Sequence, residues 1–345
     1  MKLLVRATNW VGDAIMSIPA LEAIRRRWPE AQISILAREW VADLYREQAF
    51  ADEILTLDRH SSPDGRDRAS VANKLAIKRF DSALLLPNAF NAAWIAFRAG
   101  VPERIGYARD GRSSLLTKAV RVPKEGEVPR HECYYYLELL RRIGWIDQLP
   151  DVSAICLQVA SESVAAGRLK LVAAGARADR TWIALAPGAA YGSAKCWPPE
   201  RFARAADRLV ADFKADVVLF GTAAERDVAQ RIAARMRHHP VNLAGDTPIA
   251  ELPSLFAACH LFIGNDSGAM HVAAAAGIPV VAVFGSTDPG GTAPMTLRKT
   301  LVQEPVSCSP CFLRHCPVDH RCMTRIEDDA VYDAARNWLE PLFRG

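Results

Sequence analysis

The chain has 345 residues, of which 50% are apolar and 24% are charged. This is too long for one compact core, since single domains commonly hold about 100–200 residues, so two domains are expected. The composition excludes disordered, collagenous and fibrous classes of protein. No apolar stretch approaches the roughly 20 residues of a membrane-spanning helix. The first residues do not resemble a signal peptide, and we expect a cytoplasmic protein.

The net charge of +4 is unevenly distributed. Residues 1–175 hold 25 Lys and Arg against 21 Asp and Glu, whereas residues 176–345 hold 18 of each. Within residues 98–130 there are eight basic and four acidic residues. A solvated surface explains any one of these cations, but the cluster predicts that the N-terminal half meets an anionic molecule. Nucleic acid is not expected, because the sequence shows no recognition helix, RNA-binding signature or zinc finger.

The first half opens with a predicted strand at residues 2–6, a loop, and a helix from about residue 14 to 27 with apolar residues at helical spacing. Strands are predicted at 32–36 and 82–86. A strand, a glycine-containing loop, a helix and a second strand form a βαβ unit, so this half is expected to contain a parallel sheet.

The second half repeats this alternation. Strands are predicted at 182–186, 216–220, 241–243, 261–263 and 279–284, and helices begin at 198, 224, 251 and 268. Continuous apolar strands between helices indicate a parallel sheet covered on both faces. We therefore predict two Rossmann-like domains, residues 1–175 and 176–345, that face a cleft. Residues 161–174 are the expected connecting helix, and residues 328–343 the helix that closes back.

Ligands of open parallel sheets bind beyond the carboxyl ends of the strands, and the distinctive residues follow strands. In Gly-Asn-Asp-Ser-Gly-Ala-Met-His at 264–271, a strand runs into a tight turn and a helix whose N-terminus suits a phosphate. Gly268 would let the backbone approach a ligand. The alternative is that Asp266 or Ser267 only caps the helix and that His271 is a core histidine.

Three further side chains follow predicted strands. Lys195 could face a diphosphate, although most lysines are simply solvated. Glu225 could accept hydrogen bonds from a ribose, or it could merely favour the start of a helix. Asp13 stands where a strand meets a helix in the first half, as a cap or as a general base for a substrate hydroxyl.

Five motifs in order resemble the lipopolysaccharide heptosyltransferases of glycosyltransferase family 9, and within them the type II enzymes. They lie at residues 9–13 (Asn-Trp-Val-Gly-Asp), 187–198, 221–225, 265–271 and 284–289. The resemblance covers nearly the whole chain. It implies the α/β fold class called GT-B, with the acceptor on the first domain and the nucleotide sugar on the second. It also implies inverting transfer of heptose from ADP-L-glycero-β-D-manno-heptose, without a metal or other cofactor.

The resemblance assigns roles to matched residues. Asp13 would be the catalytic base, and Lys195 with the turn at Ser267 and Gly268 would hold the diphosphate. Glu225 would contact the ribose, and the resemblance also implies donor-site positions for Ala190, Asp266 and His271. Asn9, Trp10 and Gly12 would shape the acceptor side. The acceptor, a Kdo- and heptose-containing lipid A precursor, carries anionic groups, which the basic residues Arg104, Arg109, Arg112 and Arg130 would meet. Peripheral contact with the cytoplasmic face of the inner membrane, and a monomer, are expected.

Cys308, Cys311, Cys316 and Cys322 place four cysteines within fifteen residues. Their density suggests a metal site, but the spacing of two, four and five intervening residues matches no standard zinc pattern. Reduced thiols in a folded loop are the expected state, with a structural metal as the alternative.

Other functions remain open at this point. A sugar-nucleotide epimerase shares the predicted architecture but needs no acceptor. A two-lobed binding protein would use Asp13 only as a cap. Within the family, the acceptor specificities of types I and III are the alternatives to type II.

Overall fold

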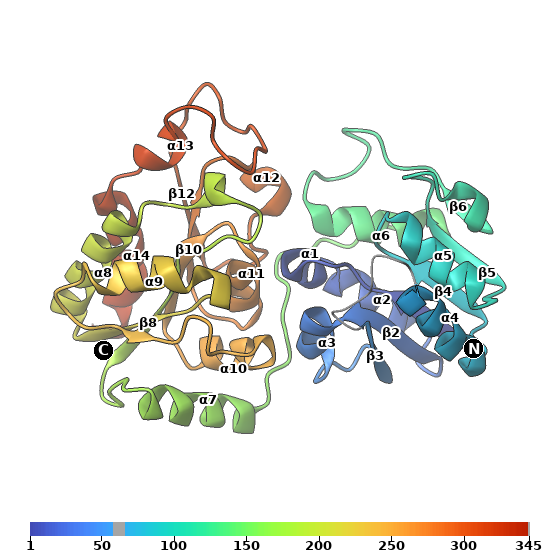
Figure 1. The fold of residues 1–345 in the computed structure, drawn as a ribbon, viewed down its shortest axis with the longest axis horizontal. Helices are drawn as coiled ribbons and strands as arrows, with labels where there is room; N and C mark the ends of the chain where they lie inside the picture. The colour runs from blue at the N-terminus through green and yellow to red at the C-terminus, as the bar shows by residue number, and fades with distance from the viewer. Residues whose placement is uncertain (58–65, 344–345) are drawn as a thin grey trace. The chain divides into compact units, whose positions relative to one another are not determined.

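A computed structural model describes residues 1–57 and 66–343. The chain forms two compact units, Met1–Val152 and Ser153–Gly345, and each holds one six-stranded parallel sheet (Figure 1). The predicted pair of α/β sheets is therefore confirmed. The division falls earlier than the expected 175/176, because helix α7 (Ser161–Ala173) packs on the second unit. Lys170 of this helix pairs with Glu251.

The sheet of the first unit has the strand order β3-β2-β1-β4-β5-β6. Its strands are β1 (Lys2–Arg6), β2 (Gln32–Arg38), β3 (Glu53–Leu57), β4 (Ser82–Leu85), β5 (Glu103–Tyr107) and β6 (Lys118–Val120). Its helices are α1 (Val11–Met16), α2 (Ile18–Arg27), α3 (Glu39–Tyr45), α4 (Arg66–Lys78), α5 (Phe90–Arg98) and α6 (Glu132–Arg142), with a short η1 (Ser113–Leu115). Apolar side chains of α4 and α5 pack on one face of the sheet.

The helix predicted at 14–27 begins earlier and is divided in two. Ser17 separates α1 from α2, and its hydroxyl donates to the Ala14 carbonyl at 2.8 Å. Pro19 has no amide hydrogen to continue the first helix. Asp13 therefore lies inside the first turn of α1 rather than before the helix.

The sheet of the second unit has the order β12-β11-β10-β7-β8-β9. Its strands are β7 (Thr181–Ala186), β8 (Ala215–Leu219), β9 (Val241–Asn242), β10 (Leu261–Asn265), β11 (Val280–Phe284) and β12 (Lys299–Gln303). Its further α-helices are α8 (Pro199–Phe213), α9 (Arg226–Ala233), α10 (Leu252–Ala257), α11 (Gly268–Ala275), α12 (Pro289–Thr292), α13 (Arg321–Thr324) and α14 (Asp328–Leu339). Short 3-10 turns are η2 (Ser193–Lys195), η3 (Ala223–Glu225), η4 (Ile249–Glu251) and η5 (Glu340–Phe343).

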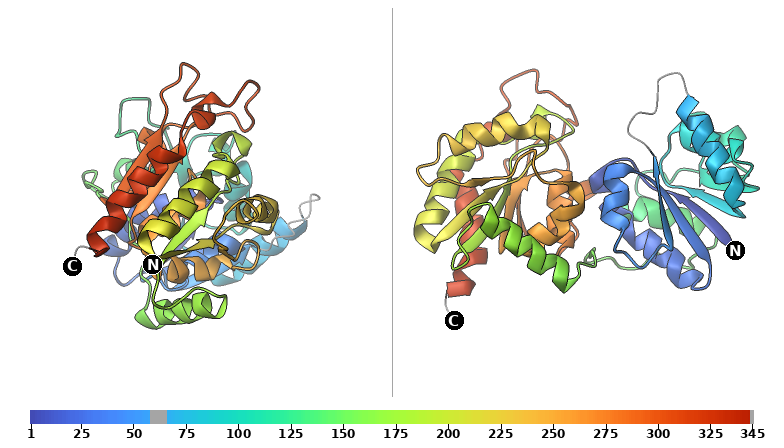
Figure 2. Two further views of the ribbon diagram at one scale, coloured as in Figure 1. Left: turned by 90° about the vertical axis from the view of Figure 1, so that its left-hand side faces the viewer. Right: turned by 60° about the horizontal axis from the view of Figure 1, so that its bottom comes forward.

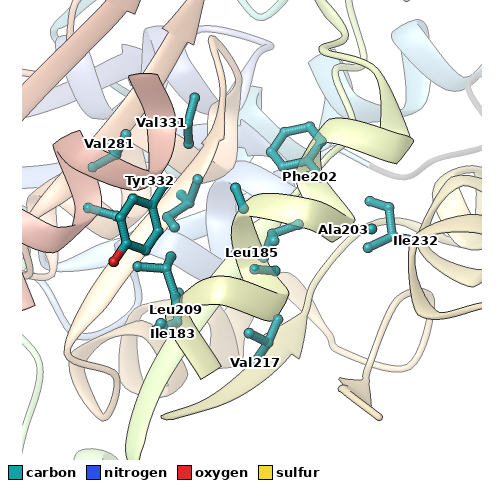
Figure 3. Close-up of a cluster of buried hydrophobic side chains, with 14 of the residues drawn as sticks. Ile183, Leu185, Phe202, Ala203, Leu209, Val217, Ile232, Val281, Val331 and Tyr332 are labelled. Carbon is teal, nitrogen blue, oxygen red and sulfur yellow. The ribbon is translucent and has the colours of Figure 1, made fainter. Parts of the chain in front are cut away.

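Alternate residues of the strands in this unit face two apolar layers. Ile183 and Leu185 of β7 join a core with α8, α9 and α14 (Figure 3). Helix α14 lies beside α8, as both views in Figure 2 also show, so the predicted C-terminal helix packs back on the second sheet. The ring of Phe256 in α10 contacts Phe262 of β10 edge-on, with centroids 5.4 Å apart. Burial of both faces explains the continuous apolar strands.

The two sheets share one topology. Counted from its first strand, each sheet has the order 3-2-1-4-5-6, which is the doubly wound dinucleotide-binding order. The chain reverses direction across the sheet between the first and fourth strands, at β1/β4 and at β7/β10. Ligand sites are expected beyond these strand ends. Within the described ranges, every helix falls short of the length and apolar character needed to cross a bilayer.

Candidate active site

The loops that follow β7 and β10 are joined at the reversal point of the second sheet. Asn265, the last residue of β10, accepts a hydrogen bond from the Trp197 amide at 3.0 Å. Its side-chain nitrogen donates to the Pro187 carbonyl at 2.6 Å. The side chain is completely buried, so these bonds fix the two predicted donor loops against each other.

Lys195 and Asp266 form an ion pair in this place. The Lys195 ammonium lies 2.5 Å from Asp266 Oδ2, and the Thr287 hydroxyl donates to the same oxygen at 2.6 Å. Asp266 is buried, and the Lys195 side chain is only 13% exposed. The ammonium also lies 5.0 Å from the centroid of the Tyr191 ring. This arrangement holds one positive charge at the carboxyl end of the sheet, where phosphate oxygens could share it. Thr287 was not among the predicted site residues, although it lies within the motif at 284–289.

Helix α11 begins beside the ion pair. Ser267 has extended backbone and its hydroxyl accepts from the Met270 amide at 3.4 Å, so it is the N-cap. The capping alternative thus holds for Ser267, and the remaining first-turn amides still point toward the helix N-terminus. Gly268 is the first residue of the helix, and His271 is buried in it.

The Glu225 carboxylate lies between the loops after β7 and β8. Its Oε2 accepts from the Thr222 amide at 2.7 Å and from the Thr222 hydroxyl at 2.9 Å, which completes a capping box. A Cβ atom at Gly188 would collide with the same carboxylate, so a larger residue there would displace the Glu225 side chain. Glu225 therefore stabilises the start of a helix, as the structural alternative expected. Its contact with a ribose stays a prediction. Ala190 is exposed in the turn before Lys195.

The predicted acceptor-side residues of the first motif gather where β1 meets α1. Asn9 Oδ1 accepts from Arg6 at 2.6 Å, and the Asn9 carbonyl accepts from the indole of Trp40 at 2.8 Å. Trp10 is the N-cap residue of α1 and is half exposed. Gly12 and Asp13 follow in the first turn, where a carboxylate is favoured by the helix dipole.

Glu132 of α6 is a site candidate that the sequence interpretation missed. Burial, followed by the charge of Asp13, raises the pKa of Glu132 to about 7. The Tyr136 hydroxyl, one turn later, also has a raised pKa because of burial and the same two carboxylates. Asp13 and Glu132 are therefore electrostatically coupled within the first unit, where α1 contacts α6. The available sequence signal was the His-Glu pair at the start of an amphipathic helix.

One of the four predicted acceptor arginines, Arg112, is structural, which corrects the prediction for it. Arg112 is completely buried. Its guanidinium donates to the carbonyls of Pro87 and Tyr107, and burial lowers its pKa to about 10. Arg104 donates to the carbonyls of Leu115 and Val101 at 2.7 and 2.6 Å. The Arg112 guanidinium therefore holds loops together rather than presenting charge to a ligand, whereas Arg104 is only partly buried and its contact with the acceptor stays a prediction.

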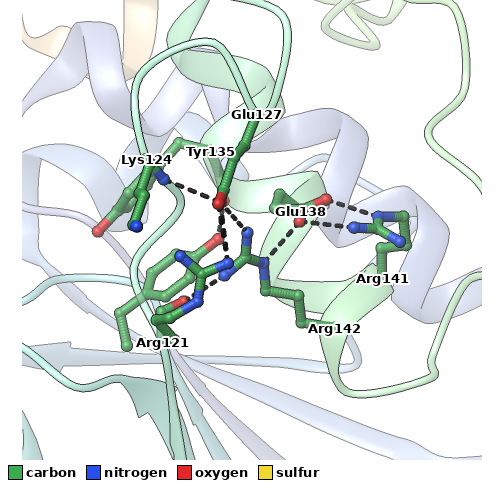
Figure 4. A network of polar contacts seen from close by, with 8 residues as sticks. Arg121, Lys124, Glu127, Tyr135, Glu138, Arg141 and Arg142 are labelled. Atoms are coloured by element: carbon green, nitrogen blue, oxygen red, sulfur yellow. Dashed lines mark hydrogen bonds and ion pairs between the residues drawn. The ribbon is translucent and has the colours of Figure 1, made fainter.

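The other two, Arg109 and Arg130, are exposed, and Arg109 Nε lies 3.7 Å from Asp110 Oδ1. Nearby cations are already neutralised, as Figure 4 shows. Arg121 and Arg142 both pair with Glu127, at 2.9 and 2.7 Å, and Arg142 also reaches the buried Glu138. The Lys124 amide, which donates to Glu127 at 2.9 Å, and then the two arginines hold the pKa of the Glu127 carboxyl down at about 2. The first unit thus presents a smaller basic surface than the charge count suggested.

The chain is similar to known glycosyltransferases along most of its length. The family model "Glycosyltransferase family 9 (heptosyltransferase)" matches residues 68–321. Lipopolysaccharide heptosyltransferase 2 of Escherichia coli is 31% identical over 312 residues, which cover 88% of each chain. The solved structure of the E. coli ADP-heptose lps heptosyltransferase II has a TM-score of 0.86 at 28% identity and covers 99% of this chain and 100% of that one. A family 9 glycosyltransferase from Veillonella parvula has the same fold, with a TM-score of 0.83 at 23% identity, covering 99% and 97%. The fold matches confirm the predicted GT-B class, and the chain belongs to glycosyltransferase family 9, the heptosyltransferase family.

Proposed function

We propose that this enzyme transfers L-glycero-D-manno-heptose from ADP-heptose to the heptosyl-Kdo2-lipid A inner core, with inversion at the anomeric carbon. The observation that carries the proposal is the similarity, over 88% of both chains, to the E. coli lipopolysaccharide heptosyltransferase 2. Relatives with type 3 names are less similar, at 24% identity over 80% of this chain. We therefore favour a type II acceptor over a type III acceptor.

The second unit is the proposed donor site. Lys195 and the N-terminal turn of α11 lie at the reversal point of the sheet, where a diphosphate would meet an ammonium and backbone amides. Glu225 is held close to the same loops and would accept from the ribose hydroxyls. Ala190, Asp266 and His271 complete the proposed lining around the heptose and phosphates.

The first unit is the proposed acceptor site. Asp13 is half-buried in the first turn of α1, next to the exposed ring of Trp10. Asn9 and Gly12 would shape the surface around it. Arg109 and Arg130 are the exposed cations that we propose to meet the phosphates and carboxylates of the acceptor.

The proposed mechanism follows from where charge develops. The Asp13 carboxylate accepts the proton of the acceptor hydroxyl as its oxygen forms the bond to the anomeric carbon. The bond from that carbon to the diphosphate oxygen breaks, and ADP departs with the added negative charge. Lys195 and the α11 amides are already oriented to stabilise that charge. In this scheme no metal or other cofactor takes part in the chemistry.

The proposed acceptor is a lipid, and the site of action follows from it. We propose that the enzyme works as a monomer at the cytoplasmic face of the inner membrane. Contact would be peripheral, through the exposed cations and the acceptor itself. Vesicles that contain the acceptor should therefore retain the enzyme at low salt and release it at high salt.

The decisive experiment supplies ADP-heptose with Kdo2-lipid A, with heptosyl-Kdo2-lipid A, or with no acceptor. Mass spectrometry should show one added heptose and released ADP only with the heptosylated acceptor. Transfer to Kdo2-lipid A would indicate type I specificity, and transfer only to an acceptor that already holds two heptoses would indicate type III. Conversion of the sugar nucleotide without an acceptor would indicate an epimerase. ADP-heptose binding without any product would indicate a binding protein.

A further inference from the structure

The four clustered cysteines line one cavity of the second unit. Cys308, Cys311, Cys316 and Cys322 surround a cavity of about 260 Å³ together with Ala194 and Ser286. All four are unpaired thiols. Cys308, Cys311 and Cys316 come from the segment between β12 and α13, in which residues 304–320 form neither helix nor strand, and Cys322 lies in α13. Irregular segments of this length are uncommon in compact domains unless something holds them.

A buried hydroxyl in the same cavity has no partner. Ser286 is 1% exposed, and its Oγ is one of three buried side-chain polar atoms without a hydrogen bond among the described residues. An unsatisfied buried hydroxyl costs about 1–3 kcal/mol. Ser286 lines the same cavity as the four thiols, whose sulfurs become better hydrogen-bond acceptors when they are deprotonated. The cavity therefore fits a bound group that turns its thiols into thiolates.

The four thiols line the same cavity; Cys322 is buried, Cys316 is half-buried, and Cys308 and Cys311 are exposed. Thiolates gathered in this way repel one another unless a cation compensates them. Cys322 is additionally confined, because a Cβ atom at Gly285 would lie 3.1 Å from its sulfur and 2.6 Å from Met323 Sδ.

We propose that Cys308, Cys311, Cys316 and Cys322 bind one divalent transition-metal ion, Zn²⁺ or Fe²⁺, as a tetrahedral four-thiolate site. Four thiols lose their protons to solvent and four metal–sulfur bonds form, with no change of oxidation state. The Ser286 hydroxyl donates to one coordinated sulfur. Among residues 1–57 and 66–343, no three His, Cys, Asp or Glu side chains already stand at metal-binding spacing. Binding therefore includes rotation of the thiols and tightening of the segment.

The proposed metal site would also affect the position of Lys195. This second step rests on the proposed function, in which Lys195 binds the diphosphate. Three contacts attach the turn at 193–195 to the cysteine segment. The Ala194 amide donates to the Arg314 carbonyl at 3.0 Å, and His320 Nε2 lies 2.9 Å from the Ala194 carbonyl. The third contact joins Ser193 Oγ to His315 Nδ1 at 3.0 Å. From the other side, the amides of Cys311 and Phe312 donate to the Ser286 carbonyl at 3.1 and 2.8 Å. The metal would thus fix the loops that carry Lys195 and Thr287.

The first test is metal content. The full-length chain, purified without chelator and under reductant, should carry about one equivalent of zinc or iron by mass spectrometry, and the analysis identifies which. The double variant Cys308→Ser/Cys311→Ser changes two exposed thiols and should lose the metal. Cys156→Ser, an exposed cysteine outside the segment, is the matched control and should keep it. Ser286→Ala should keep the fold and bind the metal about 10–100-fold more weakly.

Background metal in wild type, with the exposed thiols of Cys308 and Cys311 as reactive toward a thiol reagent as Cys156, would overturn the proposal. So would equal metal content in wild type and the double variant. The bracing role is tested separately by ADP affinity, which should fall several-fold in the double variant and remain unchanged in Cys156→Ser. Metal bound with unchanged ADP affinity would refute only the bracing. Absence of ADP binding in metal-loaded wild type would refute the proposed donor site and leave the metal site standing.

Discussion

The Lys195 ammonium lies 2.5 Å from the Asp266 carboxylate, and Thr287 donates to the same carboxylate oxygen at 2.6 Å. The three residues come from the loops after β7, β10 and β11. The two bonds to Asp266 therefore join three neighbouring strand ends. The carboxylate orients the ammonium and offsets its charge within a largely buried site. A diphosphate bound here would share the ammonium with Asp266. Replacing Lys195 therefore tests the proposed donor site directly.

Lys195→Ala should weaken ADP binding by about 10–100-fold and slow transfer. The variant removes a charge-assisted contact, which is stronger than a neutral hydrogen bond, and it leaves Asp266 bonded to Thr287. Calorimetric titration with ADP measures the effect. Lys74→Ala, an exposed helical lysine of the first unit, should bind ADP as wild type does. If Lys195→Ala bound ADP and turned over normally, the residue would not belong to the site.

The sequence predicted the second half of the fold more closely than the first, for a physical reason. Strands β7, β8, β10 and β11 are largely apolar because both faces are covered, and their predicted limits agree within two residues. In the first half, β5 begins with Glu103 and Arg104, and no prediction was made for it. The break at Ser17 depends on tertiary contacts, including the Tyr45 hydroxyl at 3.1 Å.

The site was predictable where it depends on topology alone. Lys195 and Asp266 follow adjacent parallel strands, so their approach follows from the strand order. Arg112 was not predictable as a buried residue, because its partners are carbonyls of Pro87 and Tyr107, which the fold brings together. The coupling of Glu132 to Asp13 likewise needs the contact between α1 and α6. Charge counts along the chain do not contain this information.

The arginines of the first unit should separate into two classes. Arg112→Met should destabilise the protein by about 2 kcal/mol or more, because it leaves buried carbonyls without donors. The double variant Arg109→Ala/Arg130→Ala should unfold as wild type does. Its KM for the lipid acceptor should rise several-fold, with a weaker dependence on salt. Thermal unfolding and acceptor kinetics measure the two effects.

An unchanged acceptor KM in the double variant would refute the proposed acceptor contacts. Wild-type stability of Arg112→Met would refute the structural role of that residue. Donor KM is the internal control, since it should not change in the double variant.

Glu132 should make stability depend on pH near neutrality. Its pKa of about 7 exceeds the ordinary value of 4.5, so the folded state holds this proton more tightly than the unfolded chain. The contribution is fully present below about pH 4.5 and is lost as the pH rises through 7. Glu132→Gln should therefore lose less stability than wild type between pH 5 and pH 8, measured by urea unfolding at each pH.

The control is Glu39→Gln, an exposed glutamate in the first turn of α3. It should show the pH dependence of wild type. The coupling gives a second measurement: Asp13→Asn removes a neighbouring charge and should lower the pKa of Glu132, as followed by carboxyl NMR. An unmoved resonance would show that the two carboxyl groups do not interact.

Asp13→Asn tests the chemical step itself. Asparagine has the same size as aspartate, and Trp10, not Asp13, is the N-cap residue of α1. The lost interaction with the helix dipole costs only about 0.3–1 kcal/mol, so the melting temperature should change little. Asparagine cannot take the proton of the acceptor hydroxyl, and kcat should fall by about 10²–10⁴-fold. ADP affinity should be retained, because the proposed donor residues belong to the second unit.

Asp329→Asn, at the first turn of α14, repeats the substitution away from the site and should keep full activity. A folded Asp13→Asn enzyme that transferred heptose at the wild-type rate would refute Asp13 as the base, whatever the acceptor proves to be.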